Sequence, residues 1–61
     1  MKFYVDGKKV SRKNVLDAVG ADHLGFIERE SKMAHADDPL ESIEFMIHYQ
    51  RKITRLEVRF E

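Results

Sequence analysis

The sequence has no cysteine and no tryptophan, and its 61 residues include one proline and three glycines. Without cysteine, neither a disulfide framework nor a thiolate metal site can stabilise the fold. The three glycines stand singly, so the chain has no glycine-rich phosphate loop. No apolar run approaches the roughly 20 residues that span a membrane. Because the first ten residues also lack the apolar segment of a signal peptide, we expect a cytoplasmic protein.

The short length limits how much core the chain can build. A domain of this size buries only about 60% of the surface that its unfolded chain exposes, so its stability is marginal. Good local structure or self-association can compensate. We therefore expect a single small domain, residues 1–61, that forms a homodimer.

Charge is balanced overall but unevenly distributed along the chain. Residues 1–15 carry five basic side chains against one acidic one, and residues 16–48 carry eight acidic side chains against two basic ones. Residues 49–61 are basic again, with four basic against two acidic side chains. Two basic ends thus flank an acidic middle, which is the most informative global feature of the sequence.

The N-terminal residues predict a hairpin followed by a short helix. Asp6-Gly7 is a strong signal for a type I′ turn, which needs positive φ at both central residues, so residues 2–5 and 8–10 should form two short arms. Ser11 is placed to cap a helix over residues 12–19, and Gly20 suits the position just after its end. A second helix should follow, with Leu24 and Ile27 facing inward and an end near residues 33–36.

Residues 38–49 predict a third helix. Asp38 fits the N-cap, Pro39 the first helical position and Glu41 the third residue of a capping box. The apolar stripe of this expected helix, residues 40–49, is wider than one face needs, which suggests a partner surface. The candidate interface residues are Met33, Phe45, Met46 and Tyr49.

The C-terminal residues alternate strictly, as in a strand with one buried face: Leu56, Val58 and Phe60 share one side. Its natural neighbour is the N-terminal strand. The predicted fold class is α+β, with a small antiparallel sheet formed by the N- and C-terminal strands (a β-hairpin plus a C-terminal strand) and two or three central helices packed on one face. The expected core consists of Phe3, Val5, Leu16, Val19, Leu24, Ile27, Leu40, Ile43, Ile47, Leu56, Val58 and Phe60.

No group of residues predicts catalysis or metal binding. The histidines, at positions 23, 35 and 48, lack the local spacing of a chelating motif. His35 lies near Asp37 and Asp38, but we interpret Asp38 as a cap, Asp37 as a partner of the helix dipole and His35 as a surface loop residue. We expect no enzyme activity, no cofactor and no metal.

The stretch 15–30 partly matches a helix-turn-helix, with Gly20 at the turn. The helix that would enter the major groove, residues 22–32, has three acidic and two basic side chains and would face a polyanion. Gly25 also costs this helix about 1 kcal/mol relative to alanine. The pattern favours a helix corner in a small core, with a degenerate helix-turn-helix as an alternative.

Basic residues near both ends offer a second route to nucleic acid. If the terminal strands pair, several cations share one sheet face that could follow a phosphate backbone. Glu57 and Glu61 interrupt this row and Tyr4 is the one aromatic expected there, so a solvated, self-neutralising face is the favoured interpretation. The candidate nucleic-acid contacts are Lys8, Lys9, Arg12, Lys13, Arg55 and Arg59.

These patterns favour a non-enzymatic interaction or regulatory module that acts as a homodimer and binds another protein. The edge of the terminal sheet offers a further route to self-association, by strand addition. Nucleic-acid binding is one alternative. The other is an inhibitor whose acidic surface mimics phosphates and occupies a basic groove on another protein, using Glu28, Glu30, Asp37, Asp38, Glu41 and Glu44.

Overall fold

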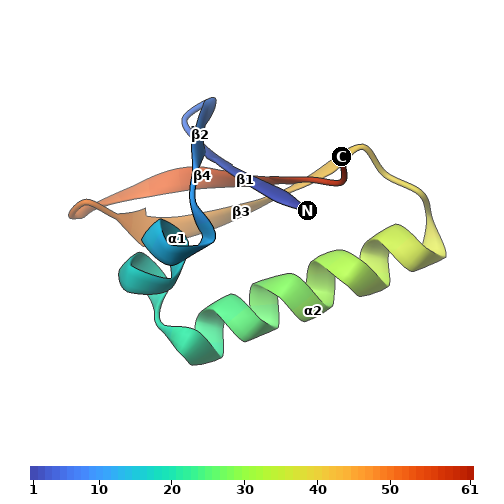
Figure 1. Cartoon of the computed structure of the whole chain (residues 1–61), viewed down its shortest axis with the longest axis horizontal. Coiled ribbons are helices and arrows are strands. Elements are labelled where there is room, and N and C mark those ends of the chain that lie inside the picture. The colour runs from blue at the N-terminus through green and yellow to red at the C-terminus, as the bar shows by residue number, and fades with distance from the viewer.

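A computed structural model describes all 61 residues as two layers, an antiparallel sheet and two helices that cover one of its faces (Figure 1). This confirms the predicted α+β fold. The elements in chain order are β1 (Lys2–Val5), β2 (Lys8–Val10), α1 (Arg12–Val19), α2 (Ala21–Asp37), β3 (Ser42–Tyr49) and β4 (Lys52–Arg59).

The four strands lie in the order β2-β1-β4-β3. The two central strands come from opposite ends of the chain and run antiparallel, with Phe3 opposite Val58 and Val5 opposite Leu56. The alternation of apolar residues places these four side chains in the core, each less than a tenth exposed. The predicted pairing of the terminal strands is therefore confirmed.

The first hairpin turns where the sequence predicts. Asp6 and Gly7 have φ of 51° and 79°, the left-handed values that a type I′ turn requires. The Asp6 carboxylate also accepts a hydrogen bond of 2.8 Å from the hydroxyl of Thr54 in β4. The turn of the first hairpin is thereby fastened to a central strand.

Two helices follow, separated by a single residue. The Ser11 hydroxyl accepts a hydrogen bond of 3.1 Å from the Asn14 N–H and caps α1 as predicted. Gly20, at φ 88°, ends α1 and begins α2. The second helix buries Leu24, Ile27 and Ser31 at helical spacing and runs further than predicted, to Asp37.

The predicted helix over residues 40–49 is wrong, because residues 42–49 form strand β3. Asp38 does not begin a helix: it caps the end of α2, with its N–H donating to the Ala34 carbonyl at 3.0 Å. Pro39 then acts as the stop signal that commonly follows a helix C-cap. The alternating residues of β3 point in turn toward the core and away from it, so one face of the strand is exposed.

The core lies between the sheet and the helices. Its eight buried apolar residues are Phe3, Val5, Val15, Leu24, Ile27, Ile47, Leu56 and Val58. Seven further apolar residues pack against them: Val10, Leu16, Val19, Ile43, Phe45, Tyr49 and Phe60. Leu40 was expected in the core but is half-buried outside this cluster, since it precedes β3 instead of facing inward from a helix.

Candidate interaction surface

The sheet has two edges, and they differ in how well they are protected against pairing with another strand. The edge strand β2 has three residues, two of them lysines. Short edge strands and lysine side chains both discourage the addition of a further strand. The opposite edge, β3, is eight residues long and contains no proline or lysine. Its register with β4 is unbroken from Ser42 to Tyr49, so no bulge bends it away.

The free side of β3 presents a regular row of backbone groups. The Phe60 N–H donates to the Glu41 carbonyl at 3.1 Å, which makes these opposite residues a hydrogen-bonded pair. In an antiparallel ladder such pairs alternate, so residues 43, 45, 47 and 49 turn their backbone groups toward β4. The other residues of the strand turn their N–H and C=O groups to the free side: Ser42, Glu44, Met46 and His48.

The side chains of Glu44, Met46 and His48 lie on the sheet face opposite the helices and are exposed. Met46 is 64% exposed, and Ile53 of β4, its diagonal neighbour on the same face, is 62% exposed. Glu44 forms an ion pair with Arg55 at 3.3 Å. The uncovered edge therefore adjoins an exposed patch that contains two large apolar side chains and both signs of charge.

At the other end of this face, polar side chains pair with one another. Arg59 donates to Glu57 at 2.6 Å and lies 3.9 Å from the centre of the Tyr4 ring. The Tyr4 hydroxyl donates to Glu61 at 2.8 Å. This hydrogen bond raises the pKa of Tyr4 and lowers the pKa of Glu61, because it favours the phenol and the carboxylate together.

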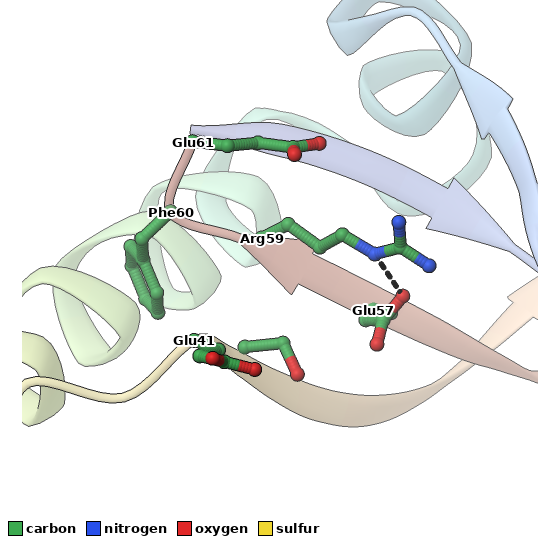
Figure 2. Close-up of a pocket in the computed structure, with 6 residues that line it drawn as sticks. Glu41, Glu57, Arg59, Phe60 and Glu61 are labelled. Carbon is green, nitrogen blue, oxygen red and sulfur yellow. Dashed lines mark hydrogen bonds and ion pairs between the residues drawn. The ribbon is translucent and has the colours of Figure 1, made fainter.

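A shallow hollow of about 480 Å³ opens beside this network (Figure 2). Its lining residues are Glu41, Ser42, Glu57, Arg59, Phe60 and Glu61. Figure 2 shows Phe60 extending away from Arg59. The Phe60 ring stacks on the His35 ring of α2, with 4.2 Å between the ring centroids. The hollow thus combines three carboxylates with a guanidinium that is already bound to one of them.

The four predicted interface residues do not form one surface. Met46 is on the open sheet face, whereas Met33 projects from α2 in the other layer. Phe45 and Tyr49 are half-buried and pack against the core from the inner side of β3. The structure therefore places these four side chains on different faces, because a strand separates side chains that a helix would have placed together.

The six predicted nucleic-acid contacts also divide between surfaces. Lys8 and Lys9 lie on β2, Arg12 and Lys13 begin α1, and Arg55 and Arg59 lie on β4. The last four are each ion-paired: Arg12 with Glu28, Lys13 with Asp17, Arg55 with Glu44 and Arg59 with Glu57. Most of this positive charge is therefore neutralised by adjacent carboxylates.

The helix pair departs from a helix-turn-helix in its connection. A single residue, Gly20, separates α1 from α2, where that motif has a turn of three or four residues.

The acidic residues expected to mimic phosphates are also dispersed over the molecule. Glu28 of α2 binds Arg12 through both carboxylate oxygens, at 3.0 Å each, and Glu44 lies on the far face of the sheet.

His35, which we expected in a surface loop, lies in the last turn of α2, with Nδ1 3.0 Å from the Leu40 carbonyl oxygen. No three histidine, aspartate or glutamate side chains gather closely enough to hold a metal ion. Neither helix has the length and apolar character required to cross a membrane.

The sequence reasoning missed the edge of β3 and its outward residues Glu44 and His48 as a pairing surface. The alternating apolar residues at 43, 45, 47 and 49 were the signal that could have identified it.

No protein family, curated protein or solved structure matches the chain.

Proposed function

We propose that the chain is a non-enzymatic protein-interaction module that forms a homodimer through the free edge of β3 and serves as a small adaptor or regulator. The observation that carries this proposal is the unprotected edge itself. An eight-residue edge strand without lysine, proline or bulge is a template for strand addition, whereas the opposite edge of the same sheet carries two such protections.

The size of the domain adds support. Only ten of the 61 residues are buried, and Phe45 and Tyr49 on the edge strand are only half-buried. A second sheet edge laid against β3 would cover both side chains and exchange water for backbone partners along the strand. Small domains commonly gain the stability that their cores lack through association of this kind.

The direct test is sedimentation equilibrium of the full chain at concentrations from about 1 to about 100 μM, a range that covers weak dimers. We expect twice the mass of the chain at the upper end, with dissociation on dilution. A monomer throughout this range would overturn the proposal.

Two lysine variants locate the contact. Met46→Lys places a charge on the free edge, and Ile53→Lys places the same charge on the same face one strand further in. The two native side chains are almost equally exposed, at 64% and 62%, so neither change should unfold the domain. We expect Met46→Lys to give a monomer and Ile53→Lys to keep the dimer. Dissociation by both variants would assign the contact to the open face instead of the edge.

A second candidate function, binding of a phosphate-bearing polymer, is favoured by one specific cluster. A hollow of about 430 Å³ is lined by Lys2, Lys9, Arg12 and Lys32, with Glu28 as its one carboxylate. Cations gathered from four elements in this way can bind phosphates. The test is binding of a generic DNA duplex at low and high salt: a steep loss of affinity with salt that is reduced in Lys9→Ala supports this function, and no binding at low salt excludes it.

A further inference from the structure

The free edge of β3 constrains how two copies can join. In a symmetric antiparallel pair, a two-fold axis passes through one position of the strand, and residues equally distant from it lie opposite each other. The backbone groups that point outward belong to residues 42, 44, 46 and 48, so these must face one another across the interface. The possible axes are few, and each specifies a different set of opposing side chains.

We infer that the two copies of the proposed homodimer join antiparallel about an axis at Met46. This inference rests on the proposed function and specifies its geometry. With the axis there, Met46 lies opposite the same residue of the second copy, and Glu44 lies opposite His48 twice, once on each side of the axis. Apolar contact at the centre is then flanked by two pairs of a carboxylate and an imidazole, a favourable combination of cross-strand neighbours.

The same register pairs apolar side chains on the inner face. Phe45 lies opposite Ile47, and Ile43 lies opposite Tyr49, so each aromatic ring faces a β-branched side chain. Pairs of this type are among the favourable ones in antiparallel sheets. The half-buried side chains of β3 would extend the core of each copy across the interface.

Other axes give poorer combinations. An axis at Glu44 places that carboxylate opposite its own copy, which is repulsive. An axis at Phe45 places Glu44 opposite Met46, so the charge gains no partner and the apolar side chain meets a carboxylate. An axis at Ile47 confines the paired ladder to residues 45–49, because residue 44 then lies opposite Gln50, whose φ of 51° belongs to the turn, whereas the axis at Met46 pairs residues 43–49.

The charge environment of the proposed pair is compatible with it. Glu44 already contacts Arg55 through one carboxylate oxygen, Oε2, at 3.3 Å, and a carboxylate has two oxygens with several acceptor positions. His48 lies opposite Ile53 in β4 and forms no ion pair within its own copy. The imidazole is therefore available to the carboxylate of the other copy.

Joining the β3 edges would also limit association to two copies. The continuous sheet would have eight strands in the order β2-β1-β4-β3-β3-β4-β1-β2, twice the four of one copy. Its only remaining edges are the two copies of β2, the short, lysine-bearing strand. A two-fold interface uses the open edge of both partners, so the assembly closes.

Cysteine trapping tests the register, because the native chain has no cysteine. Opposite residues of a hydrogen-bonded antiparallel pair have Cα atoms about 5.5 Å apart, within the range that a disulfide bridges. Under mild oxidation we expect Met46→Cys to form a covalent dimer. Ile53→Cys, a control of equal exposure, should remain largely uncrosslinked.

A charge exchange gives a second, independent readout. His48→Glu places two carboxylates opposite one another on each side of the axis and should weaken the dimer by roughly tenfold or more. Glu44→Lys removes the carboxylate that faces the imidazole and should also weaken the dimer. The double variant places a lysine opposite a glutamate and should recover most of the affinity. Circular dichroism of each variant confirms that the monomer is folded.

The outcomes separate this inference from the proposed function. A native chain that stays monomeric overturns both. A native dimer in which Phe45→Cys cross-links and Met46→Cys does not would place the axis at Phe45 and overturn the register alone. A dimer that neither variant traps would also overturn the register, and the Met46→Lys variant then decides whether the edge of β3 is the contact.

Discussion

The two hairpins of the sheet use the same kind of turn with very different residues. The first turns at Asp6-Gly7, a sequence that adopts positive φ easily. The second turns at Gln50 and Arg51, with φ of 51° and 67°, although neither residue favours the left-handed region. Non-glycine residues in that region cost of order 1 kcal/mol each and persist only where the surrounding structure holds them.

The two hairpins differ in how many residue pairs and buried side chains their strands provide. The first hairpin pairs three residues of β1 with β2, while the second pairs eight residues of β3 with β4. The second also buries Ile47 and Leu56 completely or nearly so. A short hairpin thus depends on a favourable turn, whereas a long one with buried side chains can impose an unfavourable turn. The following changes test that contrast, from the largest expected effect to the smallest.

The long hairpin should be most sensitive to loss of its buried side chains. Leu56 is fully buried and lies opposite Val5 on one side and Phe45 on the other. We expect Leu56→Ala to lower the free energy of unfolding by about 2–5 kcal/mol, through lost burial and the cavity left behind. Urea denaturation measures this loss. Ile53→Ala in the same strand, at a 62% exposed position, should change stability by less than about 0.5 kcal/mol.

Exchanging the turn sequences tests the contrast directly. Replacing Gln50-Arg51 by Asn-Gly should raise the free energy of unfolding by about 1 kcal/mol or more, because both residues then tolerate positive φ. Replacing Asp6-Gly7 by Gln-Arg should lower it by a similar amount or more, since only three residue pairs hold that turn. Thermal and urea unfolding measure both changes. Equal and small effects at the two turns would show that strand length does not decide turn tolerance.

The first hairpin has one compensating contact, the hydrogen bond from Thr54 to Asp6. Thr54→Val keeps the shape of a side chain that is only 7% exposed and removes the hydroxyl. We expect a loss of about 0.5–1.5 kcal/mol, the usual net contribution of one hydrogen bond. Once Asp6→Ala has removed the acceptor, Thr54→Val should lower the free energy of unfolding little further through this contact. A double-mutant cycle measures that coupling. Fully additive losses would mean that the contact does not stabilise the turn.

The contrast between the hairpins also explains which elements the sequence predicts. Asp6-Gly7 and the Ser11 cap are local signals that act on their own backbone, so the first hairpin and α1 follow from the sequence. Residues 38–41 carry equally strong local signals, but Asp38 and Pro39 end one helix instead of beginning another. Ile43 and Ile47, four residues apart, fit a helical stripe and an alternating strand equally well.

The candidate site was missed for a similar reason. The β-branched and aromatic residues at 43, 45, 47 and 49 favour a strand, but the apolar Met46 between them interrupts the alternation and makes the segment resemble a broad apolar helix face. The edge of β3 depends on strand order, which sequence alone left open, and the sheet order places β3 outside β4. The predicted dimer thus stays a prediction, now with a different surface to test.

The smallest expected effect concerns the ion pair that follows the first hairpin. Arg12 binds Glu28 through two hydrogen bonds of 3.0 Å and ties the chain just after β2 to α2. These hydrogen bonds lower the pKa of Glu28. The folded state therefore favours the carboxylate, so this contribution is complete above the pKa of the unfolded chain and disappears as the pH falls through the lower folded value.

Glu28→Gln removes this contribution, so native and variant proteins should differ in urea midpoint at about pH 6 and converge toward about pH 2.5. Glu30→Gln is the matched control, an exposed glutamate of the same helix without an ion pair, and it should show no such convergence. The change should be small, because the Arg12 side chain is 59% exposed and solvent screens the pair. A midpoint difference that persists undiminished in acid would attribute the effect to side-chain packing instead of charge. The anchor between the short hairpin and α2 would then be apolar in nature, like the contacts that hold the long hairpin.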